Sequence, residues 1–454
     1  MQAITQILDR MDGFGSAPAL YWRGRTHGYD AFLDLIAQWE ARLADLGIGP
    51  GSVCAFCGDY SPNVIALVFA LMKARAVLVP LTPAIEPEIP RFLDISGAEH
   101  LLRFDENDSW NHGRLTPSAR PALFSRLDES GTPGLVVFTS GSTGIPKGIL
   151  HDCDRVMRKF VQPRAGWSTV LFLLMDHFGG FNTLLGTFAY GGVGVCPESR
   201  SPQAVCAAIA AARATLLPTT PTFLNLLSAS RAYVGHDLSS LKLITYGTEM
   251  MAEATLQAVR VMFPQAELKQ TYGLSESGVL RSKSDANDSL WVKIGGPGFE
   301  TKVVDDILWV RSEANMLGYL NVESPFDAEG WYCTGDHVEV KGEYLRFLGR
   351  KSEIISVGGQ KVFPSEVESV LLEAENVVEA AVYAIPHPLL GKAVAARITL
   401  NTPEDPDALF RRLRDHCKAR LQKYKVPMRV QIVEADAQLS QRFKKTRPLD
   451  GESS

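Results

Sequence analysis

Hydrophobic and polar positions follow two alternating periods along this chain. Helical periodicity, with apolar residues three or four apart, is clear in 29–46, 62–73 and 201–214. Short apolar runs bounded by turn residues, such as 51–58 and 76–81, predict buried strands between the helices. Because the two patterns alternate, the sequence predicts an α/β fold whose sheets are mainly parallel.

The same patterns predict two domains. A polar stretch rich in turn formers, 105–133, indicates a surface connection within the first. Beyond Arg350 the chain shows a further series of strand, helix, strand and amphipathic helix, at 354–357, 364–373, 378–385 and 409–421. We therefore predict a large N-terminal domain of stacked sheets with helices, 1–351, and a small α+β lid domain, 352–454. About 100 residues suffice for an independent domain.

Composition and charge exclude several classes of protein. The 454 residues carry a formal net charge of −5, which argues against a general nucleic-acid or anionic-membrane partner. No stretch of about 18 apolar residues occurs, so we expect no membrane span. Residues 1–10 do not show the basic start and apolar run of a signal peptide.

The seven cysteines are odd in number and scattered. Cys54 and Cys57 form a Cys-x-x-Cys pair, but no second pair or nearby histidine completes a zinc site. Both lie in the apolar strand pattern at 53–57, so we predict that they pack in the core. A reducing cytoplasm suits this cysteine usage best.

The strongest chemical signal follows the apolar run 135–138. There the chain reads Thr139, Ser140, Gly141, Ser142, Thr143, Gly144, Ile145, Pro146 and Lys147. Glycines let backbone N–H groups approach anionic oxygens, hydroxyls donate further hydrogen bonds, and the lysine adds charge. The spacing does not match a Walker A loop. The sequence therefore predicts a phosphate-binding loop, with a flexible linker as the alternative.

Further motifs follow in a fixed order. They are Gly247-Thr248-Glu249, Thr271-Tyr272-Gly273-Leu274-Ser275-Glu276, Gly318-Tyr319, Gly330 to Asp336, Gly349-Arg350, Gly358 to Glu368, and Lys444-Lys445-Thr446-Arg447. Together with the phosphate loop, they resemble the adenylate-forming superfamily, which includes acyl-CoA synthetases and stand-alone adenylation enzymes. The resemblance covers most of the chain.

The resemblance implies a two-step ligase reaction. A carboxylate attacks the α-phosphate of ATP and expels pyrophosphate, and the acyl-adenylate is then passed to a thiol, for which coenzyme A is the first expectation. Both first-step reactants are anions, so the site must supply cations and donors. In this resemblance the loop from Thr139 to Lys147 holds the β- and γ-phosphates, and Ser275 donates to phosphate. Glu276 holds Mg²⁺, and Lys444 bridges the carboxylate and the α-phosphate.

The nucleoside would be held by a second group of residues. The resemblance implies that the backbone of Gly247, Thr248 and Glu249 lines the adenine pocket, and that Tyr272, followed by Gly273, lies against the base. It also implies that Asp336 accepts hydrogen bonds from the ribose hydroxyls and that Arg350 contacts ribose or phosphate. The plainer alternatives are a surface glutamate at Glu276, a turn cap at Asp336 and an exposed ion pair at Arg350.

The chain departs from the family at two positions. Phe443 stands where the family usually has glycine before the lysine, and Lys445 is an alternative to Lys444. Ser352 occupies the hinge position, where relatives more often have aspartate or lysine. A hinge there would rotate the small domain between adenylation and transfer.

The acid pocket is expected to follow residues 172–180. His177 stands where amino-acid-activating relatives have an aspartate, so we predict a fatty, aryl or other non-amino acid. A register slip by one, to Asp176, would reverse that expectation, and a histidine without substrate contact is the alternative. Phe178, Thr248 and Gly273 would line the same pocket. The stretch from Glu276 to Gly330 leaves no room for the insertion of fatty-acyl-AMP ligases.

The acceptor stays open between several chemistries. Besides coenzyme A, the resemblance allows the phosphopantetheine thiol of an acyl carrier protein, or a nitrogen nucleophile. An inactive nucleotide-binding scaffold is a further alternative. Monomers and homodimers are both common among the relatives.

Overall fold

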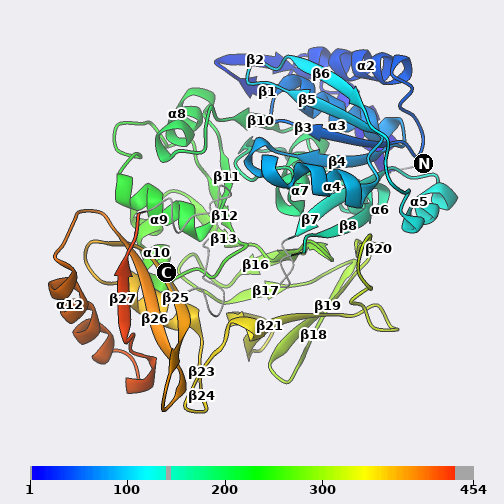
Figure 1. Ribbon diagram of the computed structural model, residues 1–454. Coiled ribbons are helices and arrows are strands. Elements are labelled where there is room, and N and C mark those ends of the chain that lie inside the picture. Colours follow the sequence, from blue (N-terminus) through cyan, green and yellow to red (C-terminus); the bar gives the residue numbers. More distant parts are fainter. Residues whose placement is uncertain (1–2, 140–144, 435–454) are drawn as a thin grey trace.

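The computed structural model describes residues 3–139 and 145–434. Two large sheets with helices make up most of it (Figure 1). The first contains, in spatial order, β13 (Glu267–Gln270), β12 (Leu243–Tyr246), β11 (Leu216–Thr219), β9 (Ser168–Val170), β10 (Val193–Cys196), β1 (Pro18–Trp22) and β2 (Arg25–Gly28). The second contains β20 (Gly318–Tyr319), β8 (Lys147–Asp152), β7 (Gly134–Thr139), β4 (Val77–Leu81), β3 (Val53–Cys57), β5 (His100–Phe104) and β6 (Trp110–Arg114). Their central strands are parallel, which confirms the predicted α/β class.

Helices fill the space between these sheets and cover their outer faces. The helices α2 (Tyr29–Asp45), α3 (Pro62–Lys73) and α7 (Phe178–Ala189) share one apolar core with the inner faces of both sheets. In β3, Cys54 and Phe56 point into this core, whereas Val53, Ala55 and Cys57 point to the outer core. Side chains alternate across a strand, so a continuous apolar run is what a strand covered on both faces requires. The predicted burial of Cys54 and Cys57 is therefore confirmed.

A third sheet is antiparallel, unlike the mainly parallel sheets that the sequence predicts. Its strands, in spatial order, are β16 (Ser282–Ser284), β17 (Val292–Ile294), β22 (Tyr344–Arg350), β21 (Tyr332–Lys341), β19 (Ile307–Ser312) and β18 (Phe299–Val304). A two-residue turn joins β18 to β19, and both of its residues, Asp305 and Asp306, have positive φ. That conformation is typical of a tight hairpin turn, which the helix and strand periods alone do not reveal.

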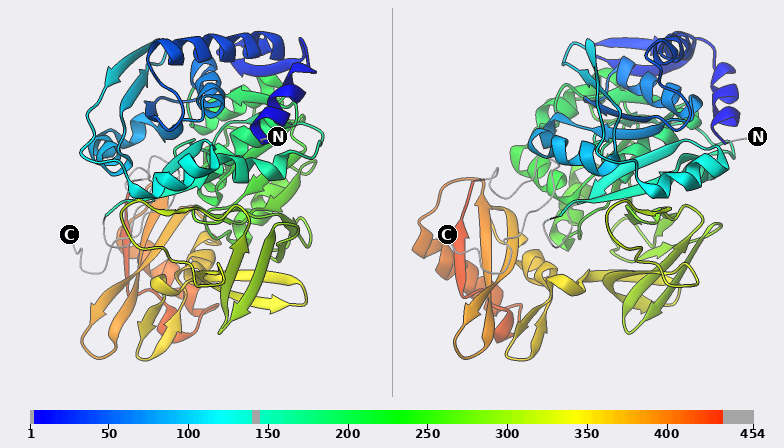
Figure 2. Two further views of the ribbon diagram at one scale, coloured as in Figure 1. Left: turned by 90° about the vertical axis from the view of Figure 1, so that its right-hand side faces the viewer. Right: turned by 45° about the vertical axis from the view of Figure 1, so that its right-hand side comes forward.

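The chain beyond β22 forms a smaller sheet with its own core. It contains β24 (Gln360–Val362), β23 (Ile355–Val357), β26 (Gly391–Leu400), β25 (Val377–His387) and β27 (Arg429–Ile432), with α11 (Pro364–Leu372) and α12 (Pro406–Lys418) packed on it. Figure 2 shows this unit, in yellow to red, beside the rest of the molecule. Asn225 of α9 (Pro221–Ser230) donates from Nδ2 to Glu379 Oε2 at 3.3 Å across the junction. The boundary after residue 351 stays a prediction.

The predicted surface connection, 105–133, contains two regular elements. The strand β6 pairs with β5 at the edge of the second sheet, and α5 (Ser125–Ser130) follows. Most of β6 is exposed, so it lacks the apolar run by which buried strands are found. Within the described residues, no helix is long and apolar enough to cross a membrane.

Candidate active site

A cavity of about 900 Å³ opens where strands of both large sheets end in loops. Ligands of open α/β sheets bind at such strand ends. The cavity brings together many of the predicted residues, namely Thr139, Lys147, His177, Gly247, Thr248, Tyr272, Gly273, Ser275, Glu276 and Arg350, with Ser352. Glu249 and Asp336 do not line it. Ser140, Gly141, Ser142, Thr143, Gly144, Lys444 and Lys445 lie outside the described residues.

The base of the phosphate loop is fixed by a side chain that the sequence analysis missed. Asn321 Nδ2 donates to the Pro146 carbonyl at 2.8 Å, and Asn321 Oδ1 accepts from Gly148 N at 3.1 Å. These two bonds hold the backbone on either side of Lys147, whose ammonium lies 5.2 Å from the ring centre of Tyr319. The Tyr-x-Asn sequence at 319–321 was the only signal, and its meaning depends on the pairing of β20 with β8.

Glu276 is bonded to the same tyrosine. Its Oε1 accepts a hydrogen bond from the Tyr319 hydroxyl at 2.7 Å, and its carbonyl accepts from Met316 N at 2.8 Å. Burial, and then the negative charge of Glu276, raise the pKa of Tyr319 far above its usual value, so the phenol stays a donor. Mg²⁺ in phosphate sites takes one or two carboxylates together with phosphate oxygens. A single oriented carboxylate beside the phosphate loop fits that requirement.

Asp336 links the adenine side of the cavity to Arg350. It accepts from the Tyr272 hydroxyl at 2.7 Å and from Arg350 Nε at 3.2 Å. Tyr272 is also stacked on Phe347, with ring centres 4.6 Å apart. Burial raises the pKa of Asp336, and the positive charge of Arg350 opposes that rise. Direct acceptance from ribose was the prediction. In the structure Asp336 orients two cavity residues, and each carboxylate oxygen has a second lone pair for another donor, so the ribose contact stays a prediction.

The loop after β12 is sterically constrained. A Cβ on Gly247 would stand 2.5 Å from Thr271 Oγ1, so only glycine lets this loop approach its neighbour. Thr248 has φ +70°, a left-handed conformation that costs energy for a β-branched residue and is often found at binding sites. The Glu249 carboxylate is directed to the first turn of α9, where it accepts from Thr222 N at 3.3 Å.

One face of α7 lines the other half of the cavity. Gly179, Thr183, Gly186 and Tyr190 recur at intervals of three or four residues and therefore share that face. Phe160, Trp167, Phe172, Leu216, Pro218 and Val279 line the same half from other elements. Because the helix residues nearest the loops are small, this half has room for the body of a substrate.

His177 and Asp176 differ in their surroundings. His177, at the start of α7, lines the cavity. Asp176 is buried, and its Oδ2 accepts from Thr82 Oγ1 at 3.1 Å, away from the cavity wall. His177 therefore lines the cavity and Asp176 does not, while the register and the role of His177 in substrate binding stay predictions.

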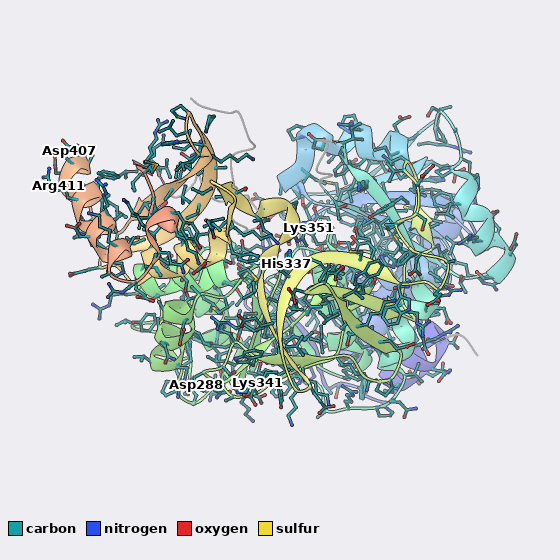
Figure 3. All side chains as sticks on the ribbon, turned by 90° about the horizontal axis from the view of Figure 1, so that it is seen from below. Asp288, His337, Lys341, Lys351, Asp407 and Arg411 are labelled. Carbon is teal, nitrogen blue, oxygen red and sulfur yellow. The ribbon has the colours of Figure 1, made fainter. Side chains whose placement is uncertain are left out.

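The link to the small domain borders the nucleotide side. Lys351 and Ser352 line the cavity directly after Arg350. Seen from below, Lys351 lies close to His337 of β21 (Figure 3), and its positive charge contributes to lowering the pKa of that histidine, after burial and Lys361. The predicted hinge position is therefore in contact with the site.

Comparison with known proteins gives a consistent assignment. Residues 8–320 match the family described as AMP-binding enzyme, and residues 366–444 match the AMP-binding enzyme C-terminal domain. One relative is the fatty acid–[acyl-carrier-protein] ligase ScoC of Streptomyces coeruleorubidus, 24% identical over 92% of this chain and 90% of its own. The structure of the anthranilate CoA ligase AuaEII with anthranoyl-AMP has a TM-score of 0.79, 22% identity and coverage of 95% and 93%. The amide bond synthetase McbA from Marinactinospora thermotolerans has a TM-score of 0.75, 25% identity and coverage of 97% of both chains.

The fold and the site define an adenylate-forming ligase. The chain belongs to the AMP-binding enzyme family, which confirms the resemblance. It is an AMP-forming enzyme that activates a carboxylic acid with ATP as an acyl-adenylate and passes the acyl group to an acceptor.

Proposed function

We propose that this enzyme activates a non-amino carboxylic acid with ATP and Mg²⁺ and transfers the acyl group to the thiol of coenzyme A. The observation that carries the proposal is the continuity of the cavity. Lys147, Glu276 and Arg350 line one half, the face of α7 lines the other, and His177 also lines it. An ammonium-bearing acid would need a carboxylate beside its amine, and Asp176 is turned to Thr82 instead.

The first step joins the acid to AMP. A carboxylate oxygen forms a bond to the α-phosphorus, and the bond to pyrophosphate breaks. In this proposal Thr139, Lys147 and Ser275 bind phosphate oxygens, and Lys444 neutralises the attacking carboxylate. Glu276 holds Mg²⁺, which balances the charge of the triphosphate. Tyr272, Arg350 and the backbone at 247–249 hold the nucleoside.

The second step forms the thioester. The thiol sulfur attacks the acyl carbon, AMP leaves, and the thiol proton is released. The small domain would turn about Ser352 between the two steps. Two related chemistries compete for the acceptor, because ScoC is a carrier-protein ligase and McbA an amide bond synthetase. We place the enzyme in the cytoplasm in this proposal, because coenzyme A and reduced thiols coexist there and the cysteines are free.

Pyrophosphate release tests the first step. The native chain would be assayed with ATP, Mg²⁺ and fatty, aryl and amino acids, beside Lys444→Ala and Lys445→Ala. We expect release with one non-amino class, and a loss of about 100-fold or more in Lys444→Ala alone. Pyrophosphate release only with amino acids would overturn the proposed substrate class. Unchanged release in Lys444→Ala would overturn the proposed role of that lysine.

The acceptor is tested separately. Coenzyme A, a holo carrier protein and a simple amine would be added in turn, and the masses of the products would be measured by mass spectrometry. A thioester of coenzyme A is the expected product. An acylated carrier or an amide, formed without that thioester, would replace the proposed acceptor.

A further inference from the structure

A fully buried histidine contacts both halves of the cavity from behind its wall. His151 belongs to β8, the strand that begins at Lys147, and it does not itself line the cavity. Its Nε2 lies 2.7 Å from the carbonyl oxygen of Ser275, and its ring centre lies 4.6 Å from that of Phe178. Ser275 and Phe178 both line the cavity. His151 therefore touches one wall residue of the nucleotide half and one at the start of α7.

The hydrogen bond to Ser275 fixes which ring nitrogen of His151 carries the hydrogen. A carbonyl oxygen only accepts, so Nε2 must be the donor. Burial lowers the pKa of His151 to about 4, against the opposite effect of the Ser275 and Ala314 carbonyls. The ring is therefore neutral near pH 7, and its single N–H is used for Ser275.

This bond helps to set the backbone of the motif that is proposed to bind phosphate and Mg²⁺. The next carbonyl, that of Glu276, accepts from Met316 N at 2.8 Å. Two consecutive carbonyls are thus held, one by His151 and one by Met316. Fixing both carbonyls fixes the peptide plane between them, and with it the directions in which the Ser275 and Glu276 side chains leave the backbone.

The ring of His151 supports the start of α7. Phe178 is the first residue of that helix and directly follows His177. Its ring is tilted by 44° against the imidazole, and a Cβ on Gly278 would stand 3.4 Å from the same Phe178 ring. Phe178 therefore packs against both His151 and the turn at Gly278. Tilted ring pairs of this kind add to the stabilisation from burial.

We propose that His151 is a positioning residue that serves the two halves of the cavity through separate contacts. Its N–H holds the Ser275–Glu276 backbone for phosphate and Mg²⁺, and its ring holds the first turn of α7 for the acid. The inference rests on the proposed function, which assigns these two halves to ATP and to the acid. His151 acts only through Ser275 and Phe178.

Two substitutions separate the two contacts. His151→Phe keeps a ring against Phe178 and removes the N–H. We expect it to raise the Kd of ATP with Mg²⁺ about 3–10-fold in titration calorimetry, because one hydrogen bond is lost. The KM of the acid with the fastest pyrophosphate release among fatty, aryl and amino acids should change less than twofold.

His151→Gln keeps an N–H of similar reach and removes the ring. The reverse pattern is expected, with the KM of that acid raised about 3–10-fold and the Kd of ATP changed less than twofold. His416→Phe is the matched control. It removes the same kind of bond, from Nε2 to the Val370 carbonyl at 2.9 Å, in the small domain, and both constants should stay within twofold.

Melting temperatures of all variants distinguish positioning from a role in folding alone. Lower melting temperatures with native Kd and KM values would overturn the inference. Equal changes of both constants in both His151 variants would overturn the separation of the two contacts. If no acid supports pyrophosphate release, the proposed function fails by itself. The ATP titration still decides the contact with Ser275, since an unchanged Kd in His151→Phe rejects it and a rise of 3–10-fold supports it.

Discussion

The two halves of the cavity hold their functional groups in different ways. On the nucleotide side, two carboxylates are oriented by neighbours: Glu276 by Tyr319, and Asp336 by Tyr272 and Arg350. On the acid side, the wall is a face of small helix residues opposite aromatic rings. Lys159, whose ammonium donates to the carbonyl of the wall residue Val279, has no acidic partner among the described residues. The nucleotide half is therefore preorganised for ATP. The shape of the acid half decides which acid is accepted.

Breaking the nucleotide half should have the largest effect. We expect Glu276→Gln to lower kcat/KM for pyrophosphate release by about 100-fold, because the amide keeps the shape but cannot supply the negative charge that Mg²⁺ needs. Glu343→Gln, at an exposed ion pair with Lys293, is the matched control and should stay within about twofold. A loss of less than about threefold in Glu276→Gln would move the metal site elsewhere.

Changing the acid half should alter substrate choice instead. A Cβ on Gly186 would stand 3.1 Å from the Phe160 ring, so Gly186→Leu must fill the pocket or shift that ring. We expect KM for the larger acids to rise about tenfold, as for a pocket that loses several methylene volumes. KM for ATP should change less than twofold. Gly113→Leu, on the exposed edge strand β6, is the control. Equal changes in both KM values would mean that the two halves are not independent.

This contrast also explains what the sequence could predict. Thr139 and Lys147 were predicted because phosphate binding demands particular residue types at short spacings, and Tyr272 and Glu276 because their motif resembles that of a known family. All four line the cavity. That Gly186 lies against the ring of Phe160 could not be predicted, because this contact depends on how α7 packs against the short helix η3 (Arg158–Phe160).

Two further features depend on the backbone. The backbone of Glu249 was predicted to line the adenine pocket, which stays a prediction; the left-handed backbone at Thr248 precedes a Glu249 side chain that reaches α9. The antiparallel third sheet was missed because its strands share no single apolar pattern: β18 is mostly half-buried or exposed, whereas β22 alternates between half-buried and buried positions. Neither a single φ angle nor the partner of a strand can be read from residue periodicity.

Tyr319→Phe sharpens the description of the nucleotide half. The variant keeps the ring beside Lys147 and removes only the hydroxyl that orients Glu276. One such hydrogen bond is worth about 0.5–1.5 kcal/mol, so the Mg²⁺ concentration for half-maximal rate should rise about 3–10-fold. The deficit should shrink as Mg²⁺ is raised, which a general folding defect would not do. Tyr383→Phe, in the small domain, should leave the Mg²⁺ titration unchanged. A deficit that is equal at all Mg²⁺ concentrations would argue against a positioning role.

The smallest expected effect is on the pH dependence of stability without substrate, which shows whether the ammonium of Lys159 has an acidic partner. The pKa of Lys159 is about 7 in the folded chain, against roughly 10.4 in an unfolded one. Between these values the unfolded chain binds more protons, so the free energy of unfolding must rise with pH across that window. Lys159→Met removes this dependence. Its melting temperature relative to the native chain should therefore be highest at pH 6 and fall towards pH 9, as measured by calorimetry. Lys418→Met, at an exposed lysine of α12, should show a constant difference. A flat difference for Lys159→Met as well would mean that the acid half already neutralises its lysine, and the contrast between the two halves would then be one of shape alone.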